Sequence, residues 1–204
     1  MKSKLNETQQ AILKAAETEF LHKGYAGART MSIAAAAGVS HTMLHYYFRT
    51  KEELFDKIFE EKLNYVTVEL AKSFDAPEGK NVIDRIKNVV ESHYTILLNN
   101  KELPGMLFTE MKNNPERMKA MIAKVSNFIN GFADANQSIL DEAAESGEIC
   151  KVDFRNLFLD ILSLNLISVA LGNVFMKLLN MEADAFYEMR RKEVVETILK
   201  RIRP

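Results

Sequence analysis

The sequence predicts an all-α protein, with a three-helix N-terminal domain built around a helix-turn-helix and a larger helical domain after it. Apolar residues recur every three or four positions along almost the whole chain, which is the period of an amphipathic helix. No segment shows the alternation of apolar and polar residues that is typical of a half-buried strand. Few of the 8 glycines and 4 prolines fall inside the periodic segments, so they mark helix ends.

The first helix is expected to begin near residue 6. Asn6 and Gln9 have the spacing of a capping box, in which each side chain satisfies a free backbone N–H of the first turn. Ile12, Ala16 and Phe20 follow at a spacing of four residues, which places them on one face. This face is predicted to pack against the next helices.

Residues 29–48 are predicted to form two short helices joined by a sharp turn. Gly38 follows an alanine-rich segment and can adopt the positive φ that reverses the chain. Ser40 is a strong N-cap for the second helix, and Val39 can pack on Leu44 as a hydrophobic staple. This order is typical of a helix-turn-helix, whose second helix enters the DNA major groove.

The rest of the chain is predicted as a series of longer helices. Thr50 and Glu53 form a second capping box that begins a long helix, and residues 75–79 break it. Pro104 and Pro115 each fit the first turn of a later helix, where a missing N–H costs nothing. The expected helices cover about 51–74, 81–99, 104–112, 115–146, 153–180 and 184–202.

The second short helix is predicted to point unusual side chains outward. At 100° per residue, Thr42 and Tyr46 face away from the buried side, with Met43 and His45 beside them. Residues 20–51 contain no Asp or Glu, although the chain has 28 acidic residues. A helical hairpin inside a core would explain the alanines alone. The outward aromatics and the missing acids indicate an anionic partner, most simply the DNA phosphate backbone.

This segment resembles the DNA-binding domain of the TetR family of bacterial transcriptional regulators over roughly residues 6–66. The family pattern appears here in four pieces, in the family's order and spacing. The pieces are Gly24-Tyr25, Ile33-Ala34-Ala35-Ala36-Ala37-Gly38-Val39-Ser40, Leu44-His45-Tyr46-Tyr47-Phe48 and Lys51-Glu52-Glu53-Leu54. His45 stands where the family usually has a tyrosine. The resemblance implies a homodimeric regulator whose two recognition helices occupy successive major grooves of a pseudo-palindromic operator.

Nine residues are expected to contact DNA, some through the backbone and some through the bases. Phosphate contacts are expected from Arg29, Thr30, Tyr46, Tyr47 and Lys51. Base-edge contacts are expected from His41, Thr42 and Met43, and His45 is expected to share both roles. The reading face lacks Arg, Asn and Gln, which make bidentate base contacts, so specificity is expected to depend on thymine methyl groups and DNA shape.

The domain boundary is expected near residue 66, with residues 1–66 binding DNA and residues 67–204 binding an effector and a second copy. The helix predicted at 154–180 is apolar almost all the way round, more than one core can bury. Simple burial in a monomer is the alternative. A homodimer formed through about 154–180 and 184–203 fits better, and it is the arrangement that the family uses.

The effector is expected to be a small, largely apolar molecule. Seven of the ten methionines follow residue 105, and such flexible side chains suit a pocket that adapts to apolar ligands. Filling of gaps in an ordinary helical core explains the methionines equally well. A cavity within about 81–175 is predicted, lined by His93, Tyr94, Met106, Met111, Asn127 and Asn130.

Other classes of protein fit the sequence poorly. It contains no phosphate-binding glycine loop, nucleophile elbow or paired-carboxylate motif, so no enzyme activity and no cofactor are predicted. His41 and His45 are four residues apart without a third ligand nearby, so no metal site is predicted. A single Cys150 and no membrane-length apolar run favour a cytoplasmic protein. The prediction is a repressor released by its effector; the alternative is an effector-free DNA-binding structural or interaction protein.

Overall fold

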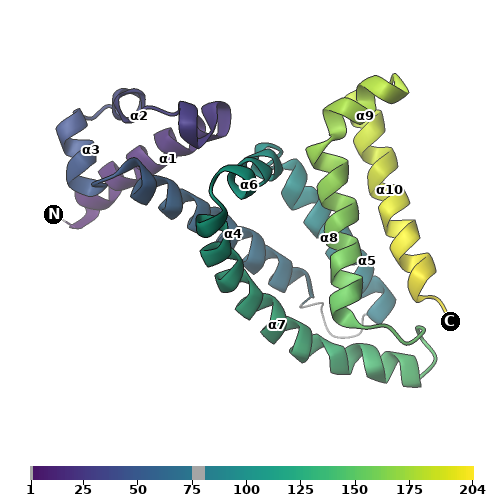
Figure 1. Ribbon diagram of the computed structural model, residues 1–204. Coiled ribbons are helices and arrows are strands. Elements are labelled where there is room, and N and C mark those ends of the chain that lie inside the picture. The colour runs from purple at the N-terminus through teal and green to yellow at the C-terminus, as the bar shows by residue number, and fades with distance from the viewer. Residues whose placement is uncertain (1, 75–80) are drawn as a thin grey trace. The chain divides into compact units, whose positions relative to one another are not determined.

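The computed structural model describes residues 2–74 and 81–204, and within these ranges all regular structure is helical (Figure 1). The all-α prediction is therefore confirmed. The break expected at residues 75–79 lies outside the described residues. The helices are α1 (Lys2–Gly27), α2 (Thr30–Ala36), α3 (His41–Tyr47), α4 (Lys51–Phe74), α5 (Val82–Leu98), α6 (Glu102–Asn113), α7 (Pro115–Glu145), α8 (Phe154–Ala170), α9 (Gly172–Leu179) and α10 (Ala183–Ile202).

The chain divides into two compact units. The first comprises the residues up to Tyr65 together with Met106–Met118, and the second comprises Val66–Gly105 and Lys119–Pro204. Helix α4 is continuous past residue 66, so its residues belong to both units. A functional boundary between residues 1–66 and 67–204 stays a prediction.

The core of the first unit consists of apolar side chains from its first four helices. Ile12 and Phe20 of α1, Leu44 of α3 and Phe55 of α4 are almost completely buried. Phe20 meets Phe55 edge to face, with ring centroids 5.0 Å apart. This arrangement of aromatic rings is favourable beyond the area that it buries. Helix α2 packs against both α1 and α3, which fixes the helix-turn-helix on this core.

The turn between α2 and α3 has the predicted glycine and the predicted N-cap. Gly38 adopts a φ of 68°, a backbone conformation that residues with a Cβ atom rarely adopt. The Ser40 hydroxyl accepts a hydrogen bond of 3.1 Å from the Met43 N–H, which caps α3. Leu44 faces the core from the middle of α3. The opposite face of this short helix is therefore turned to solvent.

Helix α1 differs from the prediction at its start. It begins already at Lys2, because no helix breaker precedes Asn6, so the prediction that Asn6 and Gln9 begin the helix is wrong. Near its other end, Gly24 interrupts the helical geometry with a φ of 65° and a ψ of 174°. The kink leads the chain towards α2.

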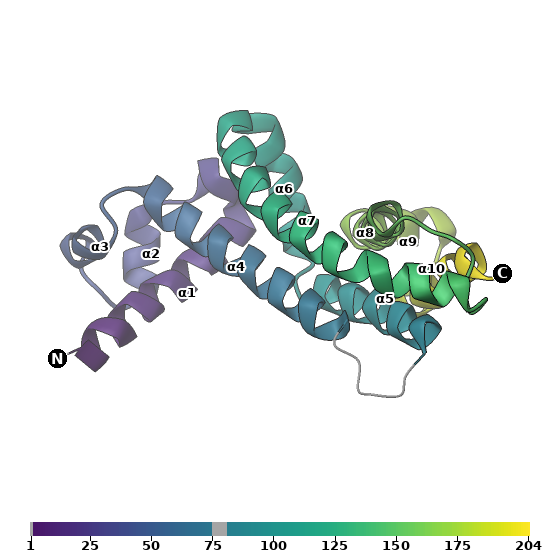
Figure 2. The same cartoon turned by 90° about the horizontal axis from the view of Figure 1, so that it is seen from below.

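The second unit is built around α5, α8 and α10, each of which packs against the other two. Figures 1 and 2 show α8 and α10 running side by side, with α5 against them. Their shared core includes Val89, Phe158, Ile161, Val194 and Ile198. The apolar face of α10 is therefore buried within its own chain.

The segment between α7 and α8 forms hydrogen bonds with the start of α5 and with the end of α10. The Glu148 carboxylate accepts hydrogen bonds from the N–H groups of Val82 (2.6 Å) and Ile83 (3.2 Å), at the start of α5. A negative charge is favourable there because the first N–H groups of a helix lack partners. The Cys150 N–H donates to the Ile202 carbonyl oxygen at 2.8 Å, at the end of α10.

The single helix predicted at 153–180 is wrong, because the chain bends by 67° between α8 and α9. Tyr187 of α10 packs against the backbone at the bend, where a Cβ on Gly172 would lie 2.6 Å from its hydroxyl oxygen. Only glycine allows this approach. Among the described helices, none alone has the length and composition of a membrane span, and only the bent α8–α9 pair reaches them when counted as one.

Candidate functional site

The solvent-facing side of α3 carries the residues predicted to read DNA. His41, Thr42, Met43 and His45 are exposed, and Tyr46 is 74% exposed. Apolar and aromatic side chains are costly to leave in water, so this concentration on a seven-residue helix indicates a binding surface. Tyr47 is half-buried, and its ring meets that of Tyr46 edge to face at 5.4 Å.

Two histidines connect α3 to its neighbours. His41 Nε2 lies 3.0 Å from Thr30 Oγ1, which links the first turn of α3 to the first residue of α2. The rings of His41 and His45 meet edge to face with centroids 4.4 Å apart. His45 Nδ1 donates to the Arg49 carbonyl oxygen at 3.2 Å, because a carbonyl oxygen can only accept. In a neutral His45, the remaining Nε2 is therefore an acceptor.

Lys51 has a structural role that the sequence did not reveal. Its ammonium group donates to the carbonyl oxygens of Tyr25 (2.8 Å) and Ala28 (3.2 Å), and it lies 4.5 Å from the centre of the Tyr25 ring. A cation is favourable at the carbonyl groups at the C-terminal end of a helix, here α1. An ammonium has three donors, so these two bonds leave one for a phosphate oxygen. The predicted phosphate contact stays a prediction.

The positive charges of the acid-free segment differ in how far they are compensated. Lys23 forms a 2.9 Å ion pair with Glu19, just outside the segment, and this hydrogen bond lowers the pKa of Glu19. Arg29 and Arg49 are exposed, and within the described part of the chain their guanidinium groups form no ion pair. These two arginines therefore supply exposed positive charge beside α2 and α3.

The residues predicted to bind an effector lie in different surroundings. His93 and Tyr94 are buried on α5 in the second unit. Met106 is buried and Met111 is exposed, and both belong to the first unit. Asn127 and Asn130 of α7 are exposed. His93 and Tyr94 are neighbours on α5, and a ligand role for all six residues stays a prediction.

His93 takes part in a buried polar contact that joins α5 to α8. The side-chain amide of Asn165 lies 3.1 Å from His93 Nδ1 and donates to the Val90 carbonyl oxygen at 3.0 Å. Burial lowers the pKa of His93 to about 4, so the ring is neutral near pH 7. Sequence reasoning missed Asn165, because its position inside an apolar helix gave no signal of a partner on α5.

Tyr94 presents an unsatisfied hydroxyl group in the core of the second unit. The residue is 1% exposed, and its hydroxyl oxygen has no hydrogen-bond partner among the residues that the structure describes. Burial raises the pKa of Tyr94 to about 12, so the group remains a neutral donor. A buried hydroxyl without a partner costs free energy that a ligand with an acceptor would recover.

The described residues contain no group of three or more His, Cys, Asp or Glu side chains placed to hold a metal ion. His41 and His45 instead bind the Thr30 hydroxyl and the Arg49 carbonyl. Their side chains are therefore engaged with the helix-turn-helix itself.

Comparison with known proteins identifies relatives of both parts of the chain. Residues 12–58 match the family model described as bacterial regulatory proteins, tetR family. The chain is 25% identical to the fatty acid metabolism regulator protein of Bacillus subtilis over 149 residues, which cover 73% of this chain and 74% of the relative.

Solved structures share the fold over nearly the whole length. A Clostridium perfringens protein proposed to be a fatty acid metabolism regulator superposes with a TM-score of 0.70 at 24% identity, covering 94% of this chain and 98% of that one. The transcriptional regulator FadR of Bacillus subtilis, in complex with stearoyl-CoA, gives a TM-score of 0.66 at 21% identity, covering 95% and 98%. The matched motifs and the helix-turn-helix geometry agree, and the chain belongs to the TetR family of bacterial transcriptional regulators.

Proposed function

We propose that the protein is a homodimeric repressor that binds a pseudo-palindromic operator in the cytoplasm and leaves it when an organic, largely apolar effector binds. The observation that carries the proposal is the exposed face of α3, held to α2 by the contact between Thr30 and His41. The absence of acidic residues from 20–51 keeps this surface compatible with phosphate. A pair of such surfaces reads two half-sites about one helical turn of DNA apart.

The DNA contacts divide into positioning and reading. Arg29, Thr30, Tyr46, Tyr47 and Lys51 bind phosphate, and His41, Thr42, Met43 and His45 reach base edges. In its neutral form, His45 offers an acceptor at Nε2 that suits the amino group of adenine or cytosine. Replacing Met43 with Ala then alters sequence preference while sequence-independent binding remains.

Self-association is proposed through the outer faces of the last helices. Leu159, Ile167, Leu171, Val174 and Leu178 of α8, α9 and their junction are all more than 40% exposed. A second copy covering these side chains removes apolar surface from water. Because Val194 and Ile198 are buried within their own chain, residues 184–203 contribute the other side of α10, where Met189 is exposed.

Dimerisation is tested by placing charges on that surface. Leu171→Glu combined with Leu178→Glu affects exposed positions, so the chain still folds but sediments as a monomer and loses operator affinity. The exposed Lys192→Glu serves as a control on α10. A wild-type protein that sediments as a monomer at micromolar concentration contradicts the proposed dimer.

The relatives support a fatty acyl compound as the effector. One relative is named a fatty acid metabolism regulator, and one structural neighbour is in complex with stearoyl-CoA. In this chain, the buried hydroxyl of Tyr94 offers a donor beside the apolar side chains of Leu97 and Val169, and a site for a long acyl chain needs such a combination of apolar surface and a few polar groups. We therefore propose a long-chain acyl-CoA.

Helix α5 links the proposed effector site to α4. It carries Tyr94, and its Asn88 side chain donates to the Ser73 carbonyl oxygen at 2.8 Å, in the last turn of α4. A ligand that displaces α5 therefore displaces the end of α4. The effector acts only through its different affinities for the DNA-bound and free conformations, typically a coupling of about 1–3 kcal/mol.

The experiment has two steps. Genomic fragments bound by the purified protein are sequenced to obtain the operator, and operator binding is then measured with acyl-CoA esters of increasing chain length. Release by long but not short esters, with Tyr94→Phe requiring more ligand, supports the proposal. Sequence-independent DNA binding that no acyl-CoA changes would instead favour the effector-free structural protein.

A further inference from the structure

Two methionine side chains of the helix-turn-helix are exposed to solvent. Met31, in the first turn of α2, is 71% exposed, and Met43, in the first turn of α3, is 44% exposed. Met106 and Met118 are instead buried. An oxidant in solution reaches an exposed thioether much more readily than a buried one, so exposure selects Met31 and Met43 for oxidation.

Positive charge accompanies both methionines. Arg29, which is exposed, precedes Met31 by two residues, and the exposed Arg49 follows the end of α3. Residues 20–51 contain no acidic side chain that would repel an anion. A surface of this kind attracts small anions as well as phosphate. Hypochlorite is such an anion, and it converts methionine to its sulfoxide.

The single cysteine lies in the second unit, away from the helix-turn-helix in the sequence. Cys150 is half-buried, and its thiol donates to the Arg201 carbonyl oxygen at 3.2 Å. One cysteine cannot form a disulfide within the chain. An oxidant that acts on α2 and α3 therefore meets methionine there and no thiol.

We infer that Met43, and to a smaller extent Met31, is a redox-sensitive modification site, where oxidation by hypochlorous acid releases the protein from its operator. In the net reaction, the thioether sulfur loses two electrons and gains one oxygen atom, while hypochlorous acid becomes chloride and a proton. Both side chains point into solvent, so the core keeps its packing. The inference rests on the proposed contact of Met43 with base edges.

The added oxygen changes the chemistry of the reading face. The thioether of Met43 suits a thymine methyl group, whereas a sulfoxide is polar and accepts hydrogen bonds. An acceptor that is buried against a methyl group loses its water without gaining a donor. At Met31, next to Thr30, the sulfoxide oxygen brings partial negative charge towards the proposed phosphate contact. Methionine sulfoxide reductases restore the thioether, so the change is reversible.

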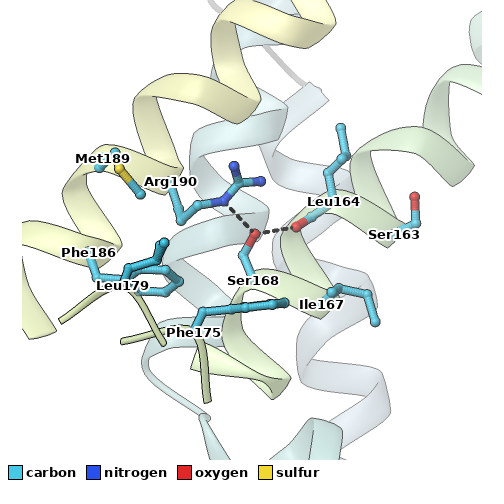
Figure 3. Close-up of a pocket in the computed structure, with 9 residues that line it drawn as sticks. All are labelled: Ser163, Leu164, Ile167, Ser168, Phe175, Leu179, Phe186, Met189 and Arg190. Atoms are coloured by element: carbon cyan, nitrogen blue, oxygen red, sulfur yellow. Dashed lines mark hydrogen bonds between the residues drawn. The ribbon is translucent and has the colours of Figure 1, made fainter. Parts of the chain in front are cut away.

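Two further exposed methionines provide comparisons within the same chain. Met111, which is 52% exposed, lies on α6. Met189, which is 39% exposed, lines a mostly apolar cavity between α8, α9 and α10 (Figure 3). The same cavity contains Arg190, whose Nε donates to the Ser168 hydroxyl oxygen at 3.2 Å. This region belongs to the faces proposed for self-association, so a second copy is expected to shield Met189.

The test treats the full chain with increasing hypochlorous acid and stops each reaction with free methionine. Peptide mass spectrometry measures the sulfoxide at each methionine, and fluorescence anisotropy measures operator affinity. Met43 and Met31 are oxidised before Met106 and Met118, and operator affinity falls about tenfold as the Met43 sulfoxide accumulates. Methionine sulfoxide reductase with a thiol restores the affinity, which distinguishes sulfur oxidation from irreversible chlorination of Tyr46.

Variants assign the effect to Met43. Met43→Leu keeps an apolar side chain without sulfur, so its operator affinity changes little between untreated and treated protein. Met43→Gln introduces a polar group and lowers the affinity by about tenfold without any oxidant. Met111→Leu is the matched control, and it responds to the oxidant as the wild type does. Operator that is bound before treatment protects Met43 and leaves Met111 reactive.

Three results would overturn the inference. The first is an unchanged operator affinity in protein whose Met43 is fully oxidised by mass spectrometry. The second is an equal loss of affinity in the wild type and Met43→Leu, and the third is a loss that persists after the reductase has removed the sulfoxide. Untreated wild type that binds no operator would contradict the proposed function and this inference together, whereas operator binding that survives oxidation contradicts this inference alone.

Discussion

Acidification is expected to destabilise the second unit through His93. Burial lowers the pKa of His93 to about 4 from an ordinary value of 6.5. Between these two values, the unfolded chain binds a proton that the folded chain does not, so stability falls as pH falls from about 6.5 to about 4 and no further below that. The Asn165 amide donates to the Val90 carbonyl, so a proton on Nδ1 would face a donor.

The size of this effect follows from the shift in pKa. A difference of about 2.5 units at about 1.4 kcal/mol per unit gives a ceiling of roughly 3–4 kcal/mol. Near pH 5 the linkage relation gives a loss of about 2 kcal/mol relative to neutral pH. This is a large share of the stability of a typical domain.

The assay is urea unfolding followed by circular dichroism at several pH values. His93→Asn keeps an acceptor near Nδ1 but cannot titrate. Between neutral pH and about pH 5, the variant should therefore lose about 2 kcal/mol less unfolding free energy than the wild type. His22→Asn removes an exposed histidine and should leave the wild-type dependence unchanged. Equal losses in the wild type and His93→Asn would refute a buried neutral His93.

Three further changes test the helix bend, the lysine contact and the turn. Gly172→Ala should lower stability by about 1–3 kcal/mol, because Tyr187 must move, whereas Gly131→Ala, with nothing within 4 Å, should raise it by up to about 1 kcal/mol in urea unfolding. Lys51→Ala should weaken binding to all DNA sequences and reduce the salt dependence of DNA binding. It should also lower stability by about 1–3 kcal/mol, and an unchanged melting temperature would contradict the contacts of Lys51 with the Tyr25 and Ala28 carbonyls. Ser40→Ala should cost about 1 kcal/mol by removing the cap of α3, and a variant of wild-type stability by calorimetry would exclude that role.

Local signals made the helices predictable. Gly38 and Ser40 indicated the turn before α3, and Pro115 and Gly147 indicated the limits of α7, because these residues act through their own backbone or their nearest neighbours. The break at Gly172 was not predicted, because the side chain that approaches the backbone there belongs to Tyr187, which lies on another helix. The helix propensity of residues 153–180 alone favoured one continuous apolar helix.

In the candidate sites, too, local features were predictable and contacts between distant residues were not. The exposed face of α3 was predictable from helical periodicity, since Leu44 fixes which side is buried. The contacts of Lys51 with Tyr25 and of His93 with Asn165 join residues far apart in the sequence, so no local pattern indicated them. Arg190 looked like part of a charged surface, and its place at an apolar cavity depends on α8 and α9.

The uninterrupted course of α4 has a geometric consequence. Its 24 residues make a rod about 36 Å long, at about 1.5 Å per residue. If the end near Ser73 tilts by about 5°, the end at Lys51 travels about 3 Å, which is close to the rise of one base pair. In the proposed two-fold dimer both rods move, so the spacing of the recognition helices changes by up to twice that distance. A displacement too small to disturb the packing at one end is thereby enough to misalign α3 with its groove at the other.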